Sequence, residues 1–192
     1  ALPIYQIYQD LNIRFIGGMI GEKEATLGIN GSGAFETENS RTYFMGSMVE
    51  YKPVSKVSLK AAYYYGRTET PKGDGLIGIG DLISDGFAFD AQYDIDQGKL
   101  AGIQLTSPLK IKKGKANLRL PYARDMYSDT VYYNNINLNL KPEAREYDIG
   151  IYYQNETSRY LWRGEFMSRF NPEHRAHVKP DYRAIWGLDW KF

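Results

Sequence analysis

The sequence predicts an all-β, antiparallel fold, and three observations lead to this prediction. Apolar and polar residues alternate along most of the 192 residues, and clusters of Gly, Pro, Asn and Asp interrupt the alternation at short spacing. No stretch keeps a helical period over about 11 residues. The final stretch, residues 182–192, is apolar at every second position. Because successive side chains of a strand point to opposite faces, one face of this last strand is apolar.

The last strand also carries its aromatic residues to the end of the chain. Trp186, Leu188, Trp190 and Phe192 share one face, and Asp189 lies on the other. Strand ends normally fray, so large aromatics there need an environment that holds them. A lipid bilayer with an aromatic belt at its rim is such an environment. The pattern therefore predicts an up-and-down β-barrel that crosses a membrane, with Asp189 facing its lumen.

Composition supports this interpretation and excludes other classes. The formal net charge is +1, so no general attraction to nucleic acid is expected. Tyr is unusually frequent, with 17 residues against 8 Phe and 3 Trp, and its ring and hydroxyl suit an interface between lipid and water. There is no cysteine, no apolar run of about 18 residues that would form a transmembrane helix, and no signal peptide at Ala1. We expect one domain over residues 1–192, either mature, cut from a longer chain or not secreted.

The first 40 residues are the hardest to interpret. Strands are expected there at residues 4–9, 11–19, 25–30 and 34–38. The later alternation is clearer, and strands are expected at residues 43–51, 57–65, 87–93, 101–105, 116–120, 135–140, 147–154, 160–169 and 182–192. A basic hairpin turn is expected around Gly114. The count is ten to twelve strands of about 8–11 residues, which is the length that crosses a bilayer when tilted.

The connections alternate in length, as they do in outer-membrane barrels. With the carboxyl terminus on the periplasmic side, the short turns 94–98 and 155–158 are periplasmic. The longer connections 67–84 and 171–181 are then external. The stretch 121–129 breaks this rule, because the same alternation places it on the periplasmic side.

Two motifs invite a chemical function. Gly73, Gly75 and Gly78 match the G-x-G-x-x-G pattern, but a dinucleotide site needs a helix to open at the motif, and none is expected. We therefore place these glycines in a flexible external loop and expect no cofactor.

The only histidines, His174 and His177, also belong to an external loop. Their spacing suits a metal only on a helix, and Pro172 and Pro180 enclose the segment. The pair could serve Ser168 in a hydrolase, but nothing orients such a set. A solvated loop is favoured, with no metal and no catalytic residue expected.

The alternation places several polar side chains on the face that is expected to line the lumen of the barrel. These are Arg119, Asn135, Asn137, Asn139, Arg163, Glu165 and Asp189. The charged members are expected mainly to neutralise one another, because unpaired charges in a narrow lumen are unfavourable. A polar channel or a plug-binding surface is the functional alternative. A basic segment, Lys110 to Lys115, is expected to be solvated, with contact to lipopolysaccharide phosphates as its alternative.

Several segments together carry a family resemblance. They are residues 82–87 (LISDGF), 107–111 (SPLKI), 116–121 (ANLRLP), 138–142 (LNLKP), 144–146 (ARE) and 171–174 (NPEH). In this order, over residues 82–192, the chain resembles the C-terminal β-barrel translocator domain of autotransporters, particularly those with a subtilisin-like serine protease passenger.

The resemblance implies a twelve-stranded barrel in the bacterial outer membrane. Such a barrel anchors and helps export an N-terminal passenger, holds a helix in its pore and has no enzymatic activity of its own. The implied partners are outer-membrane lipid and lipopolysaccharide, the chain's own passenger, and the barrel assembly machinery, which would recognise Trp186, Leu188, Trp190 and Phe192. The chain departs from the family in being shorter and in showing no passenger, protease triad or linker helix.

Three other functions remain open at this point. One is a stand-alone porin or adhesion barrel. Another is a barrel-embedded enzyme such as a protease or other hydrolase, or an acyltransferase. The last is a soluble binding protein of lipocalin type, in which the same alternation is inverted and the apolar side chains point inside.

Overall fold

The structure, a computed structural model, consists of antiparallel β-sheets. It describes residues 4–8, 10–23, 25–26, 29–30, 39–70 and 75–190. In these ranges it contains fourteen strands, eleven of them with at least five residues, a 3-10 turn at Pro172–His174 and no α-helix. The predicted all-β, antiparallel class is therefore confirmed.

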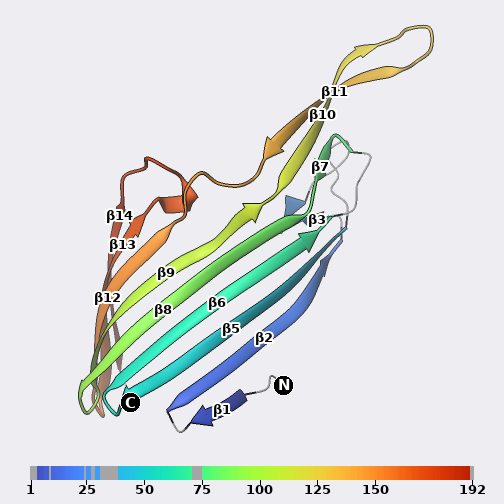
Figure 1. The fold of residues 1–192 in the computed structure, drawn as a ribbon. Helices are drawn as coiled ribbons and strands as arrows, with labels where there is room; N and C mark the ends of the chain where they lie inside the picture. The colour runs from blue at the N-terminus through green and yellow to red at the C-terminus, as the bar shows by residue number, and fades with distance from the viewer. Residues whose placement is uncertain are drawn as a thin grey trace.

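Nine strands form the main sheet, in which chain neighbours pair in nearly sequential order (Figure 1). The order is β1-β2-β5-β6-β8-β9-β12-β13-β14. The strands are β1 (Ile4–Tyr8), β2 (Leu11–Glu22), β5 (Ser40–Val54), β6 (Val57–Glu69), β8 (Leu82–Asp96), β9 (Lys99–Lys113), β12 (Tyr147–Glu156), β13 (Tyr160–Phe170) and β14 (Asp181–Trp190). Among the described residues no strand pairs with the outer edges of β1 and β14, so the sheet has two edges there.

Two smaller sheets lie outside the main sheet. One has the order β11-β10-β7 and comprises β7 (Ile77–Ile79), β10 (Lys115–Arg124) and β11 (Val131–Asn139). The other pairs β3 (Ala25–Thr26) with β4 (Ile29–Asn30). In Figure 1 the hairpin of β10 and β11 extends well beyond the end of the main sheet.

This hairpin corrects two sequence predictions. The expected hairpin turn around Gly114 is wrong, because the chain passes from β9 through Gly114 into β10 and turns back only after Arg124. The Leu140 N–H donates to the Gly114 carbonyl at 3.1 Å and closes the base of the excursion. The hairpin tip is formed by residues 125–130, and the prediction that the stretch 121–129 lies at the same end as the short turns is wrong. Alternation identified both strands, but it does not specify which neighbours a strand pairs with.

Once the β10–β11 hairpin is counted as part of the β9–β12 connection, every long connection lies at one end of the main sheet. The β5–β6, β8–β9 and β12–β13 turns are short and lie at the same end, because the strands alternate in direction. The connections β2–β5, β6–β8, β9–β12 and β13–β14 lie at the opposite end, which we call the long-connection end. The connection expected at 67–84 is partly strand: β6 continues to Glu69, and β7 and the start of β8 fall inside it.

The main sheet is curled, and burial distinguishes its two faces. In Figure 1 the strands β12–β14 turn edge-on and recede behind the others. Many side chains on the inner face are small or polar and include the buried Ser58, Ala62, Thr68, Asp148 and Tyr152. The larger Ile16, Ile20 and Tyr64 also belong to this face, over β2 and β6. The glycines Gly102 and Gly150 also belong to this face, and a Cβ at Gly102 would lie 2.3 Å from the Tyr152 ring. Small residues on the concave side thus leave room for the larger rings beside them.

No conventional hydrophobic core forms in the described residues. Only Ala62, Leu82, Ala116 and Tyr152 are buried apolar side chains. The chain exposes 13618 Å², whereas a compact soluble protein of this mass exposes about 9,300 Å². The fold therefore depends on its backbone ladders and on whatever contacts its outer face.

One turn glycine provides a test of this fold. Gly98, between β8 and β9, has a φ of +73°, and a Cβ there would lie 2.0 Å from the Glu156 carbonyl oxygen. Gly98→Ala should therefore lower the free energy of unfolding by about 1–3 kcal/mol. The measurement is denaturant unfolding followed by tryptophan fluorescence. Gly187→Ala is the matched control, because nothing lies within 4 Å of a Cβ there. Equal stability of the two variants would contradict the turn geometry.

Candidate functional site

The outer face of the main sheet is a continuous apolar surface. Strand register places its members in rows that run across neighbouring strands, such as Phe89, Leu105 and Ile149. The large side chains of this face that are exposed are Phe15, Met19, Tyr43, Met45, Tyr51, Tyr63, Phe89, Tyr93, Ile103, Tyr147, Ile149, Ile151, Phe166, Phe170, Tyr182, Trp186, Leu188 and Trp190. Exposed apolar patches on soluble monomers rarely exceed a few hundred Å², so this face is built to contact something apolar.

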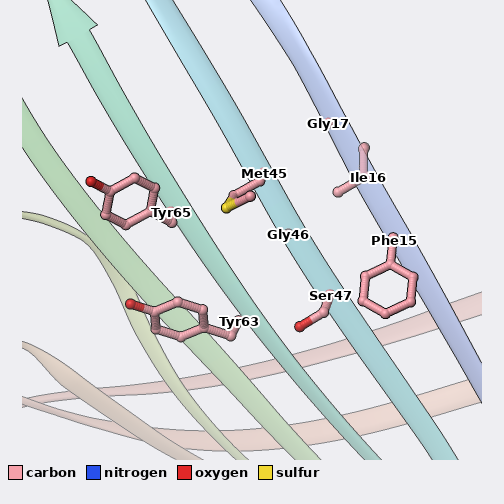
Figure 2. Close-up of a pocket in the computed structure, with 8 residues that line it drawn as sticks. All are labelled: Phe15, Ile16, Gly17, Met45, Gly46, Ser47, Tyr63 and Tyr65. Carbon is pink, nitrogen blue, oxygen red and sulfur yellow. The ribbon is translucent and has the colours of Figure 1, made fainter.

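A hollow interrupts the outer face over β2, β5 and β6 (Figure 2). It has a volume of ≈ 500 Å³ and is lined by Phe15, Ile16, Gly17, Met45, Gly46, Ser47, Tyr63 and Tyr65. The small residues Gly17 and Ser47 create the depression between the larger side chains of the outer face. Figure 2 shows the hydroxyls of Tyr63 and Tyr65 turned toward β8.

The inner face carries a connected polar network on β8, β9, β12 and β13. The buried Tyr152 hydroxyl donates to Asp90 at 2.9 Å, and the Arg163 guanidinium lies 4.6 Å from the Tyr152 ring centroid. Arg163 also pairs with Glu165 at 3.2 Å, and Glu165 accepts a 2.6 Å hydrogen bond from the Gln104 amide. Every charge of this network therefore has a partner. Such pairing is needed because an unpaired polar group in a crowded, partly desolvated interior is unfavourable.

A second polar cluster stands at the long-connection end of the same face. Glu146, only 3% exposed, accepts a 3.1 Å hydrogen bond from the Arg169 Nε, and Arg169 also lies 3.5 Å from Asp148. The remaining Glu146 oxygen accepts the Glu173 N–H at 2.6 Å. The 171–180 connection is thereby attached to β12 and β13.

His174 has a structural role that sequence reasoning missed. Its Nδ1 accepts the Glu146 N–H at 2.9 Å, and its Nε2 lies 3.0 Å from the Leu109 carbonyl oxygen. This pair of contacts requires the neutral ring with its proton on Nε2. His174 thus joins the β13–β14 connection to β9, whereas His177 is exposed. No local sequence signal distinguishes the two residues.

A group of charges also lies on the apolar outer face, at its long-connection end. Asp85, in β8, is buried and pairs with Lys112 at 3.2 Å and with Arg145. The Tyr63 hydroxyl donates to the same carboxylate at 3.0 Å, and Arg145 donates to the Ser107 hydroxyl at 3.0 Å. Register pairs Asp85 with Lys110, so both side chains point to this face.

The residues predicted to face a lumen fall into two separate groups. Arg163, Glu165 and Asp189 lie on the inner face of the main sheet. Arg119, Asn135, Asn137 and Asn139 lie together on one face of the β10–β11 hairpin, where the Asn117 amide donates to the Asn137 amide oxygen at 3.0 Å. The Arg119 guanidinium lies 4.8 Å from the Tyr133 ring centroid. The structure does not bring the two groups together, because the hairpin belongs to another sheet.

The predicted final strand is present, and its apolar side chains share one face. Register pairs Trp186, Leu188 and Trp190 with outer-face positions of β13, and Trp186 is 79% exposed. Phe192 lies outside the described residues. In the glycine motif, Gly73 is also outside them, Gly75 lies in a bend, and Gly78 pairs with Asn117 as part of β7. Gly75 and Gly78 are at the long-connection end.

The hairpin tip exposes Met126 and Tyr127 almost completely. The Asp125 carboxylate accepts the Tyr127 N–H at 2.9 Å and the Ser128 hydroxyl at 2.8 Å. These hydrogen bonds, that from the Tyr127 backbone first, lower the pKa of Asp125 below its usual value. Because its pKa is lowered on folding, Asp125 stabilises the tip at neutral pH and loses this effect as the pH falls through the folded pKa, below 3.8.

Two kinds of feature are absent from the described residues. No helix among the described residues is long and apolar enough to span a membrane. No group of three or more His, Asp or Glu side chains in the same ranges could hold a metal ion. In comparisons with known proteins, no protein-family model, curated protein sequence or solved structure matches the chain.

The inner-face network generates a prediction. Tyr152→Phe removes the hydrogen bond to Asp90 and should lower the free energy of unfolding by about 1–2 kcal/mol. Denaturant unfolding measures the change. Tyr153→Phe is the matched control, because its ring packs on Trp162 on the outer face and its hydroxyl has no hydrogen-bond partner among the described residues. If both variants unfold at the same denaturant concentration, the network does not stabilise the sheet.

Proposed function

We propose that the chain is a bacterial outer-membrane β-barrel that anchors, and helps to translocate, an N-terminal passenger. One observation carries the membrane part of this proposal. The outer face of the main sheet exposes large apolar side chains on each of its strands from β2 to β14, whereas the inner face is mainly small or polar on β8, β9 and β12–β14 and carries the apolar Ile16 and Ile20 on β2. A soluble lipocalin-type fold requires the opposite arrangement, with apolar side chains inside. A bilayer solvates the apolar face and leaves the polar face to water.

The barrel itself is part of the proposal. Lipid offers no hydrogen bonds to a strand edge, so the exposed edge of β14 must be paired in a membrane. Nine alternating strands leave β1 and β14 parallel to one another. Antiparallel closure therefore requires an even number of strands, which agrees with a barrel of 10–12 strands and needs at least one strand from outside the described residues.

The translocator role rests on the resemblance over residues 82–192. The polar inner face suits an extended or helical passenger segment, because Arg163, Glu165 and Gln104 present hydrogen-bonding groups there. The barrel assembly machinery would recognise the last strand through Trp186, Leu188, Trp190 and Phe192. The external end is then the long-connection end. The role is non-enzymatic.

A second candidate function is a stand-alone adhesion barrel or porin. The observation that favours adhesion is the β10–β11 hairpin, which extends from the long-connection end and exposes Met126 and Tyr127 at its tip. A projecting apolar tip is suited to contact another surface.

Membrane insertion is tested by placing the same charge on each face. Ile151, on the outer face, is 57% exposed, and Ile185, on the inner face, is 47% exposed. Ile151→Arg should destabilise the inserted barrel by about 2–4 kcal/mol, whereas Ile185→Arg should have little effect. The readouts are heat-modifiable migration on a detergent gel and membrane extraction. A wild-type chain that is soluble and monomeric without detergent would refute the membrane proposal.

Translocation is tested with a passenger. A small reporter domain fused before Ala1 should reach the cell surface, where external protease removes it. Leu188→Arg, which disrupts the outer face of the last strand, should abolish display by impairing assembly. A correctly assembled barrel whose reporter stays protected from external protease would exclude the translocator role and favour the stand-alone barrel.

A further inference from the structure

Lys110 has a buried side chain and no close carboxylate partner. It lies in β9 on the outer face and is 8% exposed. Among the described residues, no carboxylate oxygen lies within 4.0 Å of its ammonium group. The stem of this side chain is packed against its neighbours, while its ammonium group keeps contact with solvent. The ammonium group is therefore accessible to an anion from outside the chain.

The nearby acid does not balance the cations around it. Asp85 is already bound by Lys112, Arg145 and the Tyr63 hydroxyl. One carboxylate thus stands against three cationic side chains, those of Lys110, Lys112 and Arg145. We call these three residues the cation cluster. Lys141, which interacts electrostatically with Lys110, adds a further positive charge.

The cation cluster adjoins the apolar hollow through one side chain. The ring of Tyr63 lines the hollow (Figure 2). Its hydroxyl donates to the Asp85 carboxylate at 3.0 Å. The hollow is bordered by Phe15 and Met45 and has a volume of ≈ 500 Å³. An apolar depression on the outer face therefore leads to a positively charged group at the long-connection end. The apolar depression suits the acyl chain of a lipid, and the positively charged group beside it suits an anionic headgroup.

We propose that this region binds one lipid with a phosphorylated headgroup. The phosphate contacts the cation cluster, and an acyl chain occupies the hollow. Phosphate fits better than a carboxylate, because its oxygens accept from several donors at once and match the planar guanidinium of Arg145. The inference rests on the proposed function, since it needs the outer face in a bilayer with the long-connection end at headgroup depth. In the external leaflet the ligand is a phosphorylated glycolipid.

The experiment uses diphosphorylated lipid A as the probe and the full chain folded in detergent micelles. Native mass spectrometry measures the dissociation constant of the complex. The double variant Lys110→Gln, Lys112→Gln should raise it by at least about tenfold, because two charge-assisted hydrogen bonds are lost. The matched control is Lys56→Gln, Lys99→Gln, which removes the same charge at the exposed short-turn end. Equal affinities for lipid A in the two double variants would overturn the site.

A second pair of measurements separates a lipid from a free anion. Ser47→Phe fills the hollow without changing charge and should weaken lipid A binding severalfold. Inorganic phosphate at millimolar concentration should not displace lipid A. If phosphate displaces it completely, or if Ser47→Phe binds lipid A as the wild type does, the acyl chain contributes nothing and the lipid assignment is wrong.

Heat-modifiable migration of the same samples shows whether the barrel is folded. It therefore distinguishes failure of the lipid site from failure of the proposed function. A Lys110→Gln, Lys112→Gln chain that is folded and inserted but binds lipid A normally overturns the lipid site and leaves the barrel proposal intact. A wild-type chain that fails to insert into vesicles overturns both, because the cation cluster then meets no headgroup layer.

Discussion

The structure depends on one constraint: the outer face of the main sheet cannot be stable in contact with water alone. Its rows of Phe, Ile, Tyr and Trp continue from β2 to β14, and almost no apolar side chain is buried elsewhere in the described residues. Backbone ladders give the sheet its shape, but they contribute little net free energy when both faces meet water. In the proposed membrane, the stabilising term comes from the lipid that contacts the outer face.

On the curved inner face, polar side chains are packed closely and bind one another. Tyr152 occupies space that Gly102 leaves open, and its hydroxyl is fixed by Asp90. Arg163 then covers the Tyr152 ring and binds Glu165. Each partner satisfies a group that would otherwise be desolvated without compensation. In the outer-face cation cluster, by contrast, the charges are not balanced, because three cationic side chains lie beside one carboxylate.

Alternation with a period of two predicted much of this architecture. Strands β5, β6, β12, β13 and β14 begin and end within a few residues of their predicted positions, and the shared face of Trp186, Leu188 and Trp190 follows directly from it. The placement of the β10–β11 hairpin was not predictable, since Asn135 and Asn137 alternate with apolar residues just as main-sheet strands do. The same limit explains why Arg119 and Arg163 were expected in one lumen although they lie on different sheets. His174 and Asp85 were missed because their contacts join residues far apart in the chain.

The β10–β11 hairpin is inserted into the connection between β9 and β12, which remain direct antiparallel neighbours. Because it contributes two strands and is closed at its base by Gly114 and Leu140, it leaves β9 and β12 paired with each other, while its β10 also pairs with β7 in the β6–β8 connection. The fold therefore separates a constant scaffold from a replaceable appendage. A change in the length or sequence of the hairpin alters what the protein presents at its long-connection end, and the sheet that carries it keeps the same pairing.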